Sequence, residues 1–313
     1  MSAKLSRAFI FPGQASQYVG MAHDIYDRYQ EVRELYNQAN EIMQLDLAEI
    51  SFNGPEEKLK QTRITQPAIY VHSVAMFELL KAGNILPEAV AGHSLGEYSA
   101  LVAAGAFSFQ EGLRLVKIRG ELMQRAGEIR PGTMAAIIGL EFEQIEEICD
   151  AVSGTGVVCP ANYNSPGQVA VSGEIEAVRA AMEKAKEAGA RRAIELVVSG
   201  AFHSPLMEHA QEGLRQALAE AKIRDLAIPV YTNVMATPTT SAEEVKDLLY
   251  KQLTHPVRWT GIIEHMITDG IGAFYEVGPG KVLTGLNKRI NRELSCQPVG
   301  DLTGLDEILA AEN

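Results

Sequence analysis

Residues 89–96 read Ala89-Val90-Ala91-Gly92-His93-Ser94-Leu95-Gly96. The first three residues predict a short apolar strand, and residues 95–104 are rich in helix formers. The segment between them matches the pattern Gly-x-Ser-x-Gly, which places a serine on a sharp turn between a strand and a helix. Glycines flank the serine because the strand and the helix come close together there. The helix directs its free N–H groups and its positive dipole end at the serine. We therefore predict that Ser94 is a nucleophile, with an ordinary glycine-rich turn as the alternative.

Strands and helices alternate on both sides of this turn. Apolar strands are predicted at residues 8–11, 229–232 and 273–277, and helices at residues 25–43 and 67–81. Pro67 suits the first turn of its helix, where the backbone N–H has no partner in any case. This alternation favours a mainly parallel sheet covered by helices, so we expect an α/β protein.

Residues 127–199 have a different pattern. Strands are predicted at 133–138, 168–172 and 193–198, with helices at 141–152 and 174–188. A strand-helix-strand-helix-strand segment of this length can close a small sheet of its own. We therefore predict a large α/β subdomain made of residues 1–126 and 200–313, with residues 127–199 inserted as a small α+β subdomain.

A nucleophilic serine needs a base, and the chain has seven histidines. His93 is adjacent to Ser94, so we expect its ring to point elsewhere and to have a structural role. His203 follows the strand predicted at 193–198, in a turn of the kind where active-site loops of α/β sheets collect. His203 is therefore the candidate base, with an ordinary structural histidine as the alternative. No acidic residue near it completes a triad, so a backbone carbonyl is a possible partner for its ring.

Composition excludes several classes of function. The 313 residues include 28 basic and 40 acidic side chains, which gives a net charge of -12. Nucleic-acid binding requires a basic surface, so we expect no nucleic-acid partner. No apolar run is long enough for a membrane span, and the start Met1-Ser2-Ala3-Lys4 lacks a signal-peptide pattern. Cys149, Cys159 and Cys296 are widely separated. We therefore expect a cytoplasmic protein with reduced thiols and no metal site.

Five blocks of sequence carry a family resemblance. Residues 11–17 read Phe-Pro-Gly-Gln-Ala-Ser-Gln, residues 92–98 Gly-His-Ser-Leu-Gly-Glu-Tyr, residues 162–168 Asn-Tyr-Asn-Ser-Pro-Gly-Gln, residues 200–204 Gly-Ala-Phe-His-Ser, and residues 252–259 Gln-Leu-Thr-His-Pro-Val-Arg-Trp. In this order the blocks resemble malonyl-CoA:acyl carrier protein transacylases over nearly the whole chain. The resemblance implies an α/β-hydrolase-like large subdomain with a ferredoxin-like subdomain inserted. It also implies malonyl transfer from coenzyme A to the phosphopantetheine thiol of an acyl carrier protein, by ping-pong chemistry through a Ser94 acyl-enzyme.

The resemblance also implies roles for individual residues. Ser94 is the nucleophile, His203 is its base, and the Gln252 backbone carbonyl orients the histidine. The backbone N–H groups of Gln14 and Leu95 form the oxyanion hole.

Two further roles concern the acyl group. The resemblance implies that Arg119 binds the malonyl carboxylate, although the residues alone favour a solvated charge on a helix. Phe202 is implied to select malonyl over methylmalonyl groups. The coenzyme A thioester is a substrate, so no cofactor is expected.

One residue departs from the family pattern. The first block most often reads Gly-Gln-Gly-Ser-Gln, and Ala15 replaces its second glycine. If this position has a positive φ, alanine costs about 1 kcal/mol there. We expect a slightly altered loop that still directs the Gln14 N–H at the oxyanion.

Two alternative functions remain at this point. One is a serine hydrolase, which would have no need of Arg119, and the other is a non-catalytic docking module, which would have no need of Ser94 and His203. The sequence does not distinguish a fatty acid pathway from a polyketide pathway, and a monomer is expected.

Carrier proteins are acidic, so docking to a chain of net charge -12 needs a basic patch. The candidate groups are Arg191 with Arg192, and Lys288 with Arg289, the second pair being flanked by Lys281 and Arg292.

Overall fold

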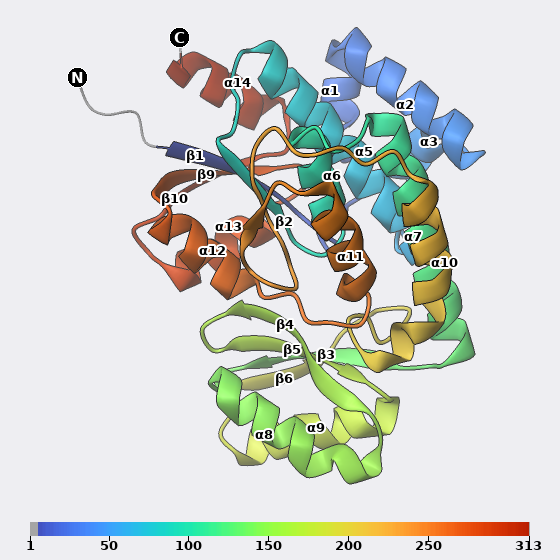
Figure 1. Ribbon diagram of the computed structural model, residues 1–313, viewed down its shortest axis with the longest axis vertical. Helices are drawn as coiled ribbons and strands as arrows, with labels where there is room; N and C mark the ends of the chain where they lie inside the picture. The colour runs from blue at the N-terminus through green and yellow to red at the C-terminus, as the bar shows by residue number, and fades with distance from the viewer. Residues whose placement is uncertain (1–5, 313) are drawn as a thin grey trace.

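A six-stranded sheet forms the centre of the large subdomain in the computed structural model, which describes residues 6–312 (Figure 1). The start of the chain, used above to judge a signal peptide, lies outside the described residues. The strands run in the order β10-β9-β1-β2-β7-β8. Their bounds are Ser295–Val299 (β10), Ile271–Val277 (β9), Ser6–Phe11 (β1), Ala89–Gly92 (β2), Val230–Tyr231 (β7) and Pro238–Thr239 (β8). All neighbours are parallel except β7 and β8.

The central strands are buried on both faces, as expected of a parallel sheet covered by helices. In β1, Phe9 and Phe11 point into one apolar core, whereas Ala8 and Ile10 point into another. Helices α12 (Trp259–Thr268) and α13 (Val282–Ile290) pack in the second core.

The remaining helices of the large subdomain contribute to the first core. They are α1 (His23–Arg28), α2 (Gln30–Met43), α3 (Leu47–Asn53), α4 (Glu56–Leu59), α5 (Thr62–Ala82), α6 (Gly96–Ala103), α7 (Phe109–Ile129), α10 (Glu208–Glu220), α11 (Ala242–Gln252) and α14 (Leu302–Glu312). A 3₁₀ turn, Pro205–Met207, precedes α10.

A second, antiparallel sheet forms the small subdomain, with strands in the order β4-β5-β3-β6. Its elements are β3 (Thr133–Ile138), α8 (Phe142–Val152), a 3₁₀ turn (Ser153–Thr155), β4 (Val158–Ser165), β5 (Gln168–Gly173), α9 (Ile175–Glu187) and β6 (Arg192–Glu195). The order strand-helix-strand-strand-helix-strand is the ferredoxin-like arrangement. The predicted fold class is therefore confirmed, and all of these elements fall within the stretch predicted to be inserted.

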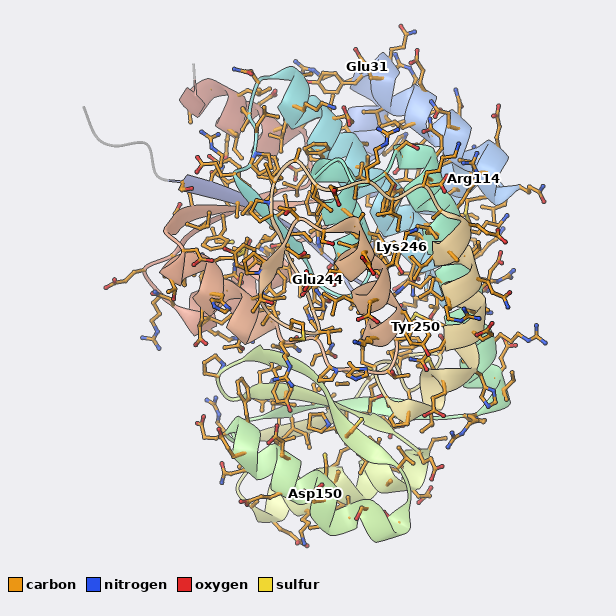
Figure 2. All side chains as sticks on the ribbon, in the orientation of Figure 1. Glu31, Arg114, Asp150, Glu244, Lys246 and Tyr250 are labelled. Carbon is orange, nitrogen blue, oxygen red and sulfur yellow. The ribbon has the colours of Figure 1, made fainter. Side chains whose placement is uncertain are left out.

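The two subdomains are joined through β4. The Val257 N–H donates to the Ala161 carbonyl (2.8 Å), and the Tyr163 N–H donates to the Val257 carbonyl (2.9 Å). The exposed side chains of Glu31 on α2 and Asp150 on α8 mark opposite ends of the long axis (Figure 2). Within residues 6–312, the helices are all too short or too polar to span a membrane.

Two helix predictions were wrong in their limits. The helix predicted from Pro67 begins at Thr62, so the proline lies inside α5. Thr62, Ile64 and Thr65 are buried, so packing continues the helix through the position where the proline removes a hydrogen bond. The helix predicted at 25–43 is interrupted at Tyr29, whose extended backbone separates α1 from α2.

Candidate active site

The predicted turn around Ser94 joins β2 to α6, and Ser94 has a φ of 50°. Both flanking glycines are required by close backbone approach. A Cβ on Gly92 would lie 1.9 Å from the Gly96 carbonyl carbon, and one on Gly96 would lie 2.0 Å from the Phe11 carbonyl oxygen. The serine therefore occupies a strained position, which the surrounding structure has to hold in place.

Asn233 holds the turn from the neighbouring strand. Its Oδ1 accepts a hydrogen bond from the Ser94 N–H, and its Nδ2 donates to the Gly92 carbonyl, both at 2.6 Å. Asn233 is fully buried and follows β7 at the carboxyl end of the sheet. Sequence reasoning missed this residue. The available signal was a polar side chain directly after the strand predicted at 229–232, where site residues of α/β sheets collect.

Ser94 and His203 lie in direct contact, with Oγ and Nε2 separated by 2.8 Å. His203 Nδ1 lies 2.8 Å from the Gln252 backbone carbonyl. A carbonyl only accepts hydrogen bonds, so Nδ1 carries the proton and Nε2 is left to accept one from Ser94. Burial, with the nearby positive charge of Arg119, lowers the pKa of His203 to about 3. The ring is therefore neutral near pH 7 and able to take the serine proton.

Arg119 lies in the middle of α7 and is 1% exposed, so the reading of a solvated helix charge does not hold. Its Nη1 donates to Gln66 Oε1 at 2.7 Å. Its Nη2 donates to Gln252 Oε1 at 2.8 Å and to Ser94 Oγ at 3.1 Å. All three acceptors are neutral, so among the described residues no carboxylate in direct contact offsets the guanidinium charge. Burial lowers the pKa of Arg119, but its ordinary value is high enough that the group stays charged.

Gln14 and Leu95 line the same pocket as Ser94 and His203. Leu95 immediately precedes α6, so its N–H belongs to the free donors at the start of a helix. Ala15 has a φ of 81°, and its N–H donates to Gln17 Oε1 at 2.8 Å. Ala15 therefore has the left-handed backbone conformation that glycine adopts more easily. The positive φ considered in the sequence analysis for this position is present.

The pocket has a volume of about 300 Å³ and is built from both subdomains. Phe202, which is next to His203 in the chain, belongs to the large subdomain. The same subdomain also provides Gln14, Ser94, Leu95, Arg119 and His203. The inserted segment provides Met134 from β3 and residues 196–198. Strand β6 ends at Glu195, three residues before the predicted end. The Leu196 N–H still donates to the Met134 carbonyl of β3, and residues 196–198 line the pocket.

His93 has the structural position expected of it. Its Nε2 donates to Asn164 Oδ1 at 2.9 Å, and its ring packs on Trp259 with 5.6 Å between centroids. The histidine lines the same pocket as Ser94, but its Nε2 is engaged with Asn164 and ties the turn to β4 of the small subdomain.

The two basic groups predicted for docking lie near one another. Arg289 Nη1 on α13 donates to Gln168 Oε1 on β5. Gln168 pairs across the sheet with Ile138, which pairs on its other side with Arg192. Neighbouring strands are about 5 Å apart, so Arg192 and Gln168 lie on the same end of the small sheet, about 10 Å apart. Arg191, Arg192, Lys288 and Arg289, called here the basic patch, are all exposed.

Other classes of site find no support in the described part of the chain. Among residues 6–312, no three His, Cys, Asp or Glu side chains are grouped so that they could hold a metal ion. Cys149, Cys159 and Cys296 are free thiols, and burial raises the pKa of each.

A serine–histidine pair that lines a pocket, with a buried cation beside the serine, on an α/β fold, defines a serine-dependent acyl-group enzyme. Comparison with known proteins narrows the class. The family model described as "Acyl transferase domain" matches residues 8–303, and the chain belongs to this family.

The similar proteins named below are all malonyl transferases that act with an acyl carrier protein. The malonyl CoA-acyl carrier protein transacylase of Bacillus subtilis is 44% identical over 94% of this chain and 93% of its own length. An acyl carrier protein S-malonyltransferase from Vibrio cholerae is 44% identical, with a TM-score of 0.93 over 97% of this chain and 99% of its own. A malonyl-transacylase solved in complex with its type II PKS acyl-carrier protein is 42% identical, with a TM-score of 0.94 over 98% of this chain and 99% of its own.

Proposed function

We propose that this chain transfers malonyl groups from malonyl-CoA to the phosphopantetheine thiol of an acyl carrier protein through a malonyl ester on Ser94. One observation carries the choice of acyl group. The Arg119 guanidinium is buried, donates to three neutral acceptors, and lies 3.1 Å from Ser94 Oγ. A carboxylate at the far end of a short acyl group suits that position. The similar proteins named above support the same activity.

The first half-reaction loads the enzyme. His203 Nε2 takes the Ser94 proton as Oγ attacks the thioester carbonyl, and the backbone N–H groups of Gln14 and Leu95 stabilise the oxyanion. The C–S bond then breaks, His203 returns the proton to the departing thiolate, and coenzyme A leaves with a free thiol.

The second half-reaction unloads it. The carrier protein's thiol gives its proton to His203 and attacks the ester carbonyl. Ser94 leaves with the proton from His203, so the enzyme is regenerated. The Gln252 carbonyl keeps the histidine ring in one orientation through both steps.

Selectivity has two sources in this proposal. Arg119 presents a planar fork that can bind a carboxylate through two hydrogen bonds, which a hydrolase of simple esters does not need. Phe202 lines the pocket beside the base, where its bulk would crowd the α-methyl group of methylmalonyl.

The basic patch is the proposed docking surface for the acidic carrier protein. It concentrates four cations on a chain of net charge -12. Complementary charge of this kind mainly accelerates association.

We propose that the transfer reaction requires no cofactor, because the coenzyme A thioester is consumed as substrate. A cytoplasmic, monomeric enzyme is proposed on composition, and the carrier protein belongs to fatty acid or polyketide synthesis.

The test of this function measures the fate of the acyl group. Incubation with malonyl-CoA and holo-acyl carrier protein should give malonyl-carrier protein with little free malonate. Rapid release of malonate without carrier acylation would instead identify a hydrolase.

A further inference from the structure

A buried carboxylate, Glu97, lies directly behind the reacting groups. It is in the first turn of α6 and is 2% exposed. Its Oε2 accepts hydrogen bonds from the Asn233 backbone N–H (3.1 Å) and from Gln252 Nε2 (2.8 Å). A buried carboxylate is costly unless it is well satisfied, so its presence here needs a reason other than packing.

The surroundings of the Gln252 amide allow one orientation only. Its Nε2 donates to Glu97 Oε2 and to the Ser94 carbonyl (3.1 Å), and its Oε1 accepts from Arg119 Nη2 (2.8 Å). Burial raises the pKa of Glu97 to about 7, so above pH 7 the group is mostly ionised. An ionised carboxylate accepts hydrogen bonds and cannot donate them, whereas a guanidinium donates and cannot accept. Glu97 and the Ser94 carbonyl therefore together fix Nε2 on their side, and Oε1 is left facing Arg119.

The amide also keeps the two opposite charges apart. A carboxylate in direct contact with Arg119 would occupy the guanidinium fork that a substrate carboxylate needs. With Gln252 between them, Glu97 acts on Arg119 through a neutral oxygen and leaves the rest of the fork free. The Gln252 backbone carbonyl serves His203 separately, so the side chain and the main chain of one residue orient two different groups.

We propose that Glu97 is a positioning residue that, through the Gln252 side-chain amide, holds Arg119 in place for the carboxylate of the acyl group. This inference rests on the proposed function. A positioning role of Glu97 can be distinguished from a purely structural role by measurement, because loss of folded enzyme lowers activity toward all acyl groups equally. Loss of Arg119 positioning lowers activity more toward those that carry a carboxylate, because only these bind the guanidinium fork.

The test is Glu97→Gln, which keeps the shape of the side chain and removes its charge. A glutamine at this position can donate or accept, so only the Ser94 carbonyl and Arg119 then favour the native orientation of the Gln252 amide, which is held less firmly against Arg119. At pH 8, where wild-type Glu97 is mostly ionised, we expect the ratio of kcat/KM for malonyl-CoA to kcat/KM for acetyl-CoA to fall about tenfold, measured as acylation of Ser94. An unchanged ratio, whether both rates persist or fall together, would overturn the proposal.

Two further variants make the test decisive. Glu276→Gln is the matched control: Glu276 is equally buried, but it accepts the N–H groups of Leu283 and Thr284 at the start of α13, away from Arg119. In Glu276→Gln the malonyl-to-acetyl ratio of kcat/KM should stay at the wild-type value. A fall equal to that in Glu97→Gln would overturn the proposed role of Glu97. Gln252→Met removes the amide but keeps the backbone carbonyl, so it should reproduce the fall in the ratio. Even if Glu97→Gln does not fold, an unchanged ratio in Gln252→Met overturns the proposal, because Glu97 is proposed to act through this amide.

Failure of this inference is distinct from failure of the proposed function. If wild-type enzyme is not malonylated on Ser94, the proposed function itself fails. If wild-type enzyme is loaded and the variants keep its malonyl-to-acetyl ratio, only the role of Glu97 fails.

Discussion

His203 Nδ1 lies 2.8 Å from the backbone carbonyl of Gln252, in the place where a serine triad usually has an acidic side chain. The carbonyl orients the ring without adding a negative charge. Burial and the charge of Arg119 then dominate, and the pKa of His203 falls to about 3. The base is therefore kept neutral by its surroundings and oriented by the main chain.

This low pKa predicts a contribution to acid sensitivity. Between the ordinary pKa of 6.5 and the folded value of about 3, the unfolded chain binds a proton at His203 that the folded chain does not. The free energy of unfolding therefore falls as pH falls through this range. At pH 5 the loss from this residue is about 2 kcal/mol. His203→Gln should lack this part of the loss in urea unfolding at pH 7 and pH 5, with exposed His209→Gln as control. Equal pH sensitivity in wild type and His203→Gln would contradict the assignment.

Arg119→Ala should remove the preference for a carboxylated acyl group. Charge-assisted hydrogen bonds contribute about 1.5–3 kcal/mol, so the malonyl-to-acetyl ratio of kcat/KM should fall on the order of a hundredfold. Arg119→Lys should recover part of it, because a point charge cannot bridge both carboxylate oxygens. The control is Arg114→Ala, an exposed arginine on the same helix (Figure 2). An unchanged ratio in Arg119→Ala would remove this residue from the acyl pocket.

Ala15→Gly should stabilise the protein. Ala15 has a φ of 81°, which glycine adopts without steric cost, so we expect a gain of up to about 1 kcal/mol in the free energy of unfolding. Ala188→Gly is the matched control, since its φ of -77° suits alanine, and this change should not stabilise. Equal effects of the two changes would show that the loop carries no strain at Ala15.

Reversal of the basic patch should weaken carrier-protein use without affecting loading. In Arg192→Glu and Arg289→Glu, KM for the carrier protein should rise, more at low salt than at high salt, because screening removes long-range attraction. Acylation of Ser94 by malonyl-CoA should be unchanged. Arg114→Glu, remote from the small sheet, controls for net charge (Figure 2). If both reversals leave KM unaffected at low ionic strength, the carrier protein docks elsewhere.

The sequence predicted some elements well because local pattern and tertiary environment agree. Strand β3 was predicted with its observed bounds, as an apolar run that starts just after a Pro-Gly pair. Strand β4 was missed, since Pro160, Asn162 and Asn164 all disfavour a strand. It is an edge strand with irregular register, where proline is tolerated.

The site shows the same division. The turn around Ser94 follows from residues adjacent in sequence. Arg119 was predicted only through family resemblance, because one arginine on a helix gives no sign that its helix face is buried. Asn233 and Glu97 act through contacts with segments more than 130 residues away. The place of Asn233 directly after a strand was a local signal, but no local pattern identifies the partners of either residue.

The central claim is that Ser94 carries the malonyl group. Mass spectrometry of peptides from enzyme incubated with malonyl-CoA should find the malonyl adduct on the peptide that contains Ser94. The adduct should be absent in Ser94→Ala and should be discharged when holo-acyl carrier protein is added to the loaded wild-type enzyme. A full adduct on Ser94→Ala, or an adduct confined to another residue, would contradict the account.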